Sequence, residues 1–170
     1  MSVDLEEMGK LIKAKRELDR VTDTFLWKNF YLKVKLEHPD AKMPTRAFSG
    51  DAGMDVYSIE NVNIPSRSTI KISLGFSVEF PEGYVLIVQD KSGRAYNTGY
   101  QTKGNIIDAA YRGICHVVMK SDADDWIYIP KGEKIAQMLV LPCWTGVPEQ
   151  VEELSDSDRG SGGFGSTGVK

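Results

Sequence analysis

Hydrophobic residues recur at helical spacing over the first part of the chain. Asp4 can cap the amino end of a helix, and Glu7 follows three residues later, as in a capping box. The apolar positions with this spacing are Leu5, Met8, Leu11, Ile12, Leu18 and Val21. The pattern predicts an amphipathic helix from about Asp4 to Val21, and a stripe of this kind ordinarily packs against the rest of its own protein.

From Phe30 onward the pattern changes to short runs rich in Val, Ile, Thr and aromatic residues, such as Tyr31–Leu36 and Tyr84–Val88. Turn formers, among them Pro81-Glu-Gly83, separate these runs. Such spacing predicts an all-β sandwich or barrel. The stretch 159–168 is so rich in glycine that we expect it outside the core, and mobile unless a ligand orders it.

Composition narrows the functional class. A chain of 170 residues with 41% apolar content suits one domain with a proper core. The formal net charge is −3 with both signs interleaved, so no basic face favours a nucleic acid polymer, and a nucleotide needs a local site. The start has no signal core and no apolar run is long enough to cross a membrane, so we expect a soluble, cytoplasmic protein.

The glycine-rich tail carries residue types that suit a polyphosphate. Its glycines let backbone amides approach an anion, Ser166 and Thr167 supply hydroxyl donors, and Arg159 supplies a forked cation. Phe164 has the flat ring that can stack on a nucleobase. The alternative is a disordered terminus, which these four side chains make the less favoured interpretation.

Four internal segments carry further polar chemistry, and each has a plain structural alternative. Asp90–Ala95 offers cations, a hydroxyl and a glycine for a phosphate, but alone it indicates only a turn. Asp108, three residues before Tyr111, is either a general base or a turn cap. Asp55 is either a turn anchor or an outer-sphere Mg²⁺ ligand. Gln137, inside an apolar strand, needs a hydrogen-bond partner that is either structural or a ligand.

Taken in order, these segments resemble the five motifs of the trimeric dUTPase family. The matching stretches are Ala52–Asp55, Lys91–Gly93, Ile107–Gly113, Gly132–Gln137 and Arg159–Gly168. The resemblance implies a jelly-roll-like β-barrel over residues 30–158, with an additional helical extension at 1–29 and a flexible lid at 159–170. It also implies a homotrimer whose subunits share each active site.

The resemblance further implies Mg²⁺-assisted hydrolysis of dUTP to dUMP and pyrophosphate. Asp108 would activate the water that attacks the α-phosphorus, and Tyr111 would pack against the deoxyribose. The resemblance also implies that uracil contacts Asn105, Ile106 and Ile107, and that the phosphates contact Lys91, Ser92, Gly93 and Gln137. Asp55 would contact a metal-bound water. The closing tail would come from a neighbouring subunit, with Arg159, Phe164, Gly165, Ser166 and Thr167.

Two motifs depart from the family's usual pattern. Lys91 stands where arginine is usual, and lysine keeps the charge but lacks the bidentate fork. Arg94 stands where an apolar residue is usual, in a position to compensate. Asn105 replaces a frequent glycine in the uracil hairpin, and asparagine tolerates a positive φ better than most residues. The base preference is therefore less firmly implied than the reaction.

Two other functions compete with dUTP hydrolysis. The related dCTP deaminases carry a catalytic glutamate at the position that aligns with Val118, and valine cannot shuttle protons. A non-catalytic protein could instead sense dUTP with its tail and engage a protein partner, of unknown identity, through the helix. The presence of Asp108, Tyr111 and Arg159 favours the enzyme. The sequence suits a bacterium or a phage-infected cell equally.

Overall fold

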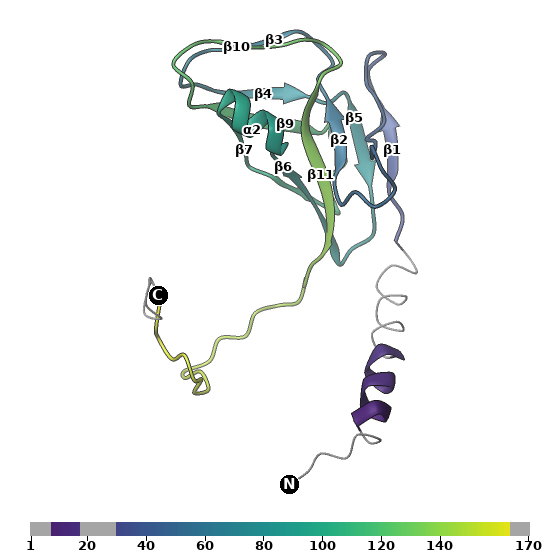
Figure 1. Ribbon diagram of the computed structural model, residues 1–170, viewed down its shortest axis with the longest axis vertical. Helices are drawn as coiled ribbons and strands as arrows, with labels where there is room; N and C mark the ends of the chain where they lie inside the picture. Colours follow the sequence, from purple (N-terminus) through teal and green to yellow (C-terminus); the bar gives the residue numbers. More distant parts are fainter. Residues whose placement is uncertain (1–7, 18–29, 164–170) are drawn as a thin grey trace.

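The computed structural model of the protein describes residues 8–17 and 30–163, and strands dominate it (Figure 1). The elements after residue 30 are β1 Lys33–Leu36, β2 Met54–Tyr57, β3 Val62–Ile64, β4 Thr69–Ser73, β5 Phe76–Glu79, β6 Tyr84–Gln89, α2 Ser92–Thr98, β7 Tyr100–Lys103, β8 Ile106–Asp108, β9 His116–Ser121, β10 Ile127–Ile129 and β11 Lys134–Pro142. The all-β class predicted from the sequence is confirmed.

The strands pair antiparallel in four groups, ordered β2-β11-β6-β8, β4-β9-β7, β1-β5 and β10-β3. The long strand β11 lies between β2 and β6, so Gln137 is opposite Asp55 on one side and Gln89 on the other. β11 therefore brings together three polar segments that are far apart in the sequence.

Alternate residues of each strand face the interior, as the pleat requires. In β9 the buried positions are Val117, Met119 and Ser121, and the residues between them are partly exposed. Val56, Leu86 and Met138 each have about 0% of their surface exposed, and they join strands β2, β6 and β11 in one core. Burying a side chain of this size contributes about 1.5–3 kcal/mol. This packing holds the site-bearing strand ends in register.

The chain outside the barrel differs from expectation in one respect. Residues 8–17 are helical, as predicted, but Met8, Leu11 and Ile12 are all exposed, and the helix stands away from the strands (Figure 1). The apolar stripe therefore does not pack on its own barrel within these residues, because no strand faces it. The other positions of the predicted helix, 4–7 and 18–21, lie outside the described residues.

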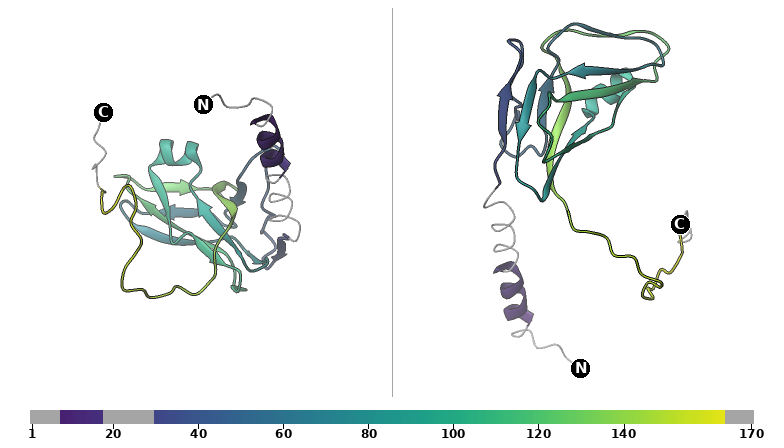
Figure 2. Two further views of the ribbon diagram at one scale, coloured as in Figure 1. Left: turned by 90° about the horizontal axis from the view of Figure 1, so that it is seen from below. Right: turned by 180° about the vertical axis from the view of Figure 1, so that it is seen from behind.

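Beyond β11, residues 143–163 form no strand, and the chain runs away from the barrel in Figure 1 and in the right view of Figure 2. Trp144, Val147 and Leu154 are each at least 76% exposed. The strands thus end at Pro142, earlier than the barrel boundary expected at residue 158. In the described part of the chain no helix has both the length and the apolar character needed to cross a bilayer.

Candidate active site

A cleft of about 520 Å³ lies where β6 leads into α2, beside the start of β11. It is lined by Lys91, Ser92, Gly93, Arg94, Asn97, Glu133, Lys134 and Gln137. We call this group the cation cleft, because three of its side chains are cationic. The sequence predicted Lys91, Ser92, Gly93 and Gln137 as neighbours, and the structure brings these four together.

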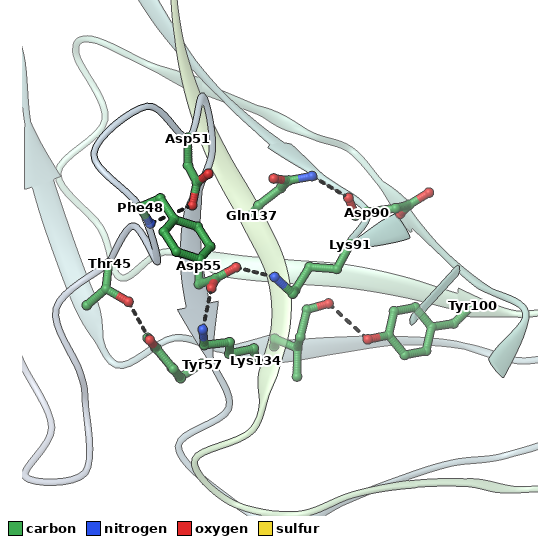
Figure 3. Close-up of polar contacts among 11 residues, drawn as sticks. Thr45, Phe48, Asp51, Asp55, Tyr57, Asp90, Lys91, Tyr100, Lys134 and Gln137 are labelled. Carbon is green, nitrogen blue, oxygen red and sulfur yellow. Dashed lines mark hydrogen bonds and ion pairs between the residues drawn. The ribbon is translucent and has the colours of Figure 1, made fainter. Parts of the chain in front are cut away.

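Asp55 lies beside the cation cleft and joins two of its cations. Its side chain is only 10% exposed, and its Oδ1 accepts from Lys91 while its Oδ2 lies 2.7 Å from Lys134 Nζ (Figure 3). Burial raises the pKa of Asp55, but the hydrogen bonds and charges of Lys134 and Lys91 outweigh burial and hold that pKa below its usual range. Asp55 is thus an ionised carboxylate that anchors both lysines. Lys134 was not singled out from the sequence.

Gln137 has the specific partner that its place in an apolar strand required. Its Nε2 donates to the backbone carbonyl of Asp90 at 2.8 Å (Figure 3). The Asp90 carboxylate in turn accepts from the Thr102 amide at 2.6 Å. Gly53 makes this arrangement sterically possible, because a Cβ there would overlap the Gln137 amide, lying 2.9 Å from its Cδ. The missing side chain of Gly53 therefore leaves space for the Gln137 amide to hold the Asp90 carbonyl at the edge of the cleft.

A separate pocket of about 190 Å³ surrounds the end of β8. It is lined by Val88, Gly104, Ile106, Ile107, Asp108, Tyr111, Cys115, His116 and Val118. We call it the Asp108 pocket, because Asp108 is the one carboxylate in a lining that is otherwise mostly apolar. The structure thus brings Ile106, Ile107, Asp108 and Tyr111 together, as predicted, and adds His116, for which the sequence gave no signal.

The turn after β8 fixes Tyr111 beside Asp108. The Tyr111 amide donates to the Asp108 carbonyl at 3.0 Å, and the Tyr111 hydroxyl donates to the Ile114 carbonyl at 3.0 Å. Gly113 permits this fold, because a Cβ there would lie 2.6 Å from Tyr111 Cζ. The ring is 44% exposed, so one face remains open to a ligand.

The hairpin before β8 has its positive φ at a different residue from the one expected. Asn105 does not take the positive φ that its tolerance suggested; Gly104 does, with φ at 58°. The Asn105 carbonyl accepts from the Val88 amide at 2.8 Å, which ties the hairpin to β6. Asn105 itself does not line the Asp108 pocket, whereas Gly104 does.

The phosphate loop expected at Asp90–Ala95 is also only partly a loop. Helix α2 starts at Ser92 and ends at Thr98, and Gly99 caps it with a left-handed conformation and an amide that donates to the Ala95 carbonyl. Thr98 Oγ1 donates to the Arg94 carbonyl at 2.7 Å, which stabilises this short helix. The helix directs the Arg94 side chain into the lining of the cation cleft.

Among residues 8–17 and 30–163, none lines both the cation cleft and the Asp108 pocket. Arg159 lines neither, and its Nε donates to the Gly162 carbonyl at 2.8 Å within the tail. The remaining tail predictions, Phe164, Gly165, Ser166 and Thr167, lie outside the described residues. One chain therefore carries the predicted residues in three separate places.

Comparison with known proteins identifies the family of this chain. The sequence model of the dUTPase family matches residues 39–168. The chain belongs to the dUTPase family. The Clostridioides difficile deoxyuridine 5′-triphosphate nucleotidohydrolase is 44% identical over 82% of this chain and 99% of its own length. The protein of the same name from Paramecium bursaria Chlorella virus 1 is 36% identical over 81% of this chain and 98% of its own.

Solved dUTPase structures share the fold. A mutant Staphylococcus bacteriophage 80alpha dUTPase with dUpNHpp superposes with a TM-score of 0.77 at 34% identity, over 82% of this chain and 99% of that one. A mutant dUTPase from phage phi11 of S. aureus, described with a structural Mg(II) ion, has a TM-score of 0.68 at 28% identity, over 74% of this chain and 99% of that one. The dUTPase fold expected from the resemblance is thereby confirmed.

Proposed function

We propose that this chain hydrolyses dUTP to dUMP and pyrophosphate, as a homotrimer whose subunits share each active site. The relatives that match nearly their whole length are named for this reaction. The observation that supports the shared site is that the cation cleft and the Asp108 pocket have no described lining residue in common. A nucleotide needs both a phosphate site and a nucleoside site, and in the proposed trimer the cleft of one subunit would face the Asp108 pocket of another.

Asp108 is the proposed general base. It lies at the exposed end of β8, where water has access, and it is the one carboxylate that lines its pocket. A carboxylate in that place can accept a proton from the water that attacks the α-phosphorus. Tyr111, held by its bond to the Ile114 carbonyl, offers its open ring face to the deoxyribose.

The cation cleft is the proposed phosphate site. Ser92 and Gly93 supply a hydroxyl and an open backbone, and the ammonium of Lys91 lies among them. Phosphoryl transfer depends mainly on positioning and charge neutralisation, so a cleft with three cationic side chains suits it. Gln137 fixes the Asp90 carbonyl at the start of this segment and so positions the residues that follow.

Mg²⁺ fits this site through Asp55 and a bound water. Each Asp55 oxygen accepts from one lysine, and a carboxylate oxygen has a second lone pair for a water. The described residues contain no group of three or more metal-binding side chains, which agrees with a cation held mainly by phosphates. When bound, Mg²⁺ would neutralise phosphate charge at this end of the cleft.

The tail is the proposed lid of a neighbouring subunit. Residues 144–161 are exposed and lead away from the barrel (Figure 1), so they have the length and freedom from their own barrel to reach another subunit. There Arg159 would face the outer phosphates, Phe164 would cover the base, and Gly165, Ser166 and Thr167 would donate to phosphate. A lid of this kind excludes water during the reaction.

Deamination is disfavoured by the lining of the Asp108 pocket. Val118, which aligns with the catalytic glutamate of the deaminases, faces that pocket as an apolar side chain. The described lining of the pocket thus has an apolar side chain where the deaminases have their catalytic glutamate.

The Asp108→Asn variant tests the proposed reaction. The change keeps the shape and removes the base, so dUTP binding should persist while turnover falls about 10²–10⁴-fold. Calorimetric titration of dUTP and an assay of pyrophosphate release measure the two effects. Asp124→Asn is the control, because Asp124 is 84% exposed and lines neither cavity. Unchanged turnover in Asp108→Asn would rule out the assigned base.

A further inference from the structure

The two lysines of the cation cleft already share one carboxylate as ion-pair partner. Asp55 pairs with Lys91 through one oxygen and with Lys134 through the other. An ammonium held in this way keeps fewer N–H groups for a phosphate, and it offers no planar fork. The lysines therefore leave the cleft without a free bidentate donor.

Among the residues that the structure describes, Arg94 is the one guanidinium that lines this cleft. Its backbone is fixed in α2, since its amide donates to the Lys91 carbonyl at 2.9 Å and its carbonyl accepts from Thr98 Oγ1. Its side chain is 30% exposed, so solvent and ligand reach it. The position is thus both anchored and open.

Glu133 holds the Arg94 guanidinium in place. The two side chains form an ion pair, and Glu133 is only 19% exposed. The backbone of Glu133 is fixed as well, because its carbonyl accepts from the Ser58 amide at 3.0 Å. A guanidinium has five N–H donors, so one edge can remain on Glu133 while another donates to a phosphate.

We propose that Arg94 is a ligand of the dUTP polyphosphate chain, positioned by Glu133, and that it supplies the bidentate contact that Lys91 lacks. The inference rests on the proposed function, since it assigns the ligand of the same cleft. Arg94 then makes the cleft selective for a phosphate chain over an uncharged nucleoside.

The test compares Arg94→Ala, Arg94→Lys and wild type, with Arg16→Ala as the control. Arg16 is an exposed helical arginine outside the barrel, so its loss changes the net charge equally. Calorimetric titration with inorganic tripolyphosphate measures phosphate binding without turnover, and steady-state assays give KM and kcat for dUTP. Thermal melting verifies that each variant is folded.

Arg94→Ala should weaken tripolyphosphate binding and raise the KM for dUTP by roughly tenfold or more, as expected for a charge-assisted hydrogen bond. Arg94→Lys should recover part of this loss, kcat should change less than KM, and Arg16→Ala should match wild type. The assignment would be overturned if a folded Arg94→Ala variant bound tripolyphosphate as tightly as wild type. It would also be overturned if the wild-type protein did not bind tripolyphosphate. If wild type bound tripolyphosphate but did not hydrolyse dUTP, and Arg94→Ala weakened tripolyphosphate binding, the proposed reaction would be wrong and the role of Arg94 in phosphate binding would be supported.

Discussion

Single polar residues could be selected from the sequence, but their partners could not. Asp55 was recognisable as a carboxylate that enters a strand just after a turn of small residues, and Gln137 as a polar side chain within an apolar strand. Their partners, Lys91 and the Asp90 carbonyl, are 36 and 47 residues away along the chain. Such pairs depend on how β11 lies between β2 and β6, which no local pattern contains. The structure settles that Asp55 anchors two lysines, and its contact with a metal-bound water remains our proposal.

Gly53→Ala tests the close contact between Gly53 and the Gln137 side chain. The new methyl group would overlap the Gln137 amide and move it off the Asp90 carbonyl, which should destabilise the protein by about 1–3 kcal/mol, as overpacking does. The KM for dUTP should rise because the cleft loses its anchor. Chemical denaturation and steady-state kinetics measure both effects. Gly50→Ala is the control, since no atom lies within 4 Å of a Cβ there; equal behaviour of the two variants would contradict the steric role of Gly53.

At the scale of elements, alternation and turn formers predicted the strands well. The run at Tyr84–Val88 became β6 almost without change, because one face of that strand packs into the core. Helix α2 was missed, because a seven-residue helix is shorter than the stretch of sequence over which helical periodicity can be recognised. The amino-terminal helix was predicted correctly over 8–17, but its packing partner was not, because an apolar stripe indicates burial without naming the surface that buries it.

Leu86→Ala tests how far β6 depends on the common core. Leu86 has 0% exposure and pairs with Val140 of β11 on one side and Ile107 of β8 on the other. Its truncation should cost about 2–5 kcal/mol of unfolding free energy. Leu36→Ala, at a position that is 46% exposed on β1, should cost much less. Urea unfolding compares them, and a similar loss in both would show that β6 is not central to the fold.

At the scale of the whole molecule, one chain carries the proposed parts of the active site in separate places. The cation cleft, the Asp108 pocket and the tail are separate, and the tail runs away from its own barrel. Sequence patterns could place the motifs in order along the chain, and only the family resemblance suggested that different subunits combine them. Rotational symmetry would give every site one copy of each part.

Complementation between two inactive variants tests the shared site. Asp108→Asn lacks the base, and a chain ending at Asp158 lacks the lid. If different subunits supply these parts, co-expression in mixed trimers should restore turnover well above that of either variant alone. Sizing by light scattering verifies the trimer. Mixed trimers without activity would show that each chain completes its own site.

The most direct test of the central claim is the release of pyrophosphate from dUTP, dCTP, dTTP and UTP, each supplied separately with Mg²⁺, together with identification of the product. We expect selective conversion of dUTP to dUMP and pyrophosphate, and loss of turnover when a chelator removes the metal. Tight binding of dUTP without turnover would contradict the enzymatic function and identify a nucleotide-responsive binding protein instead.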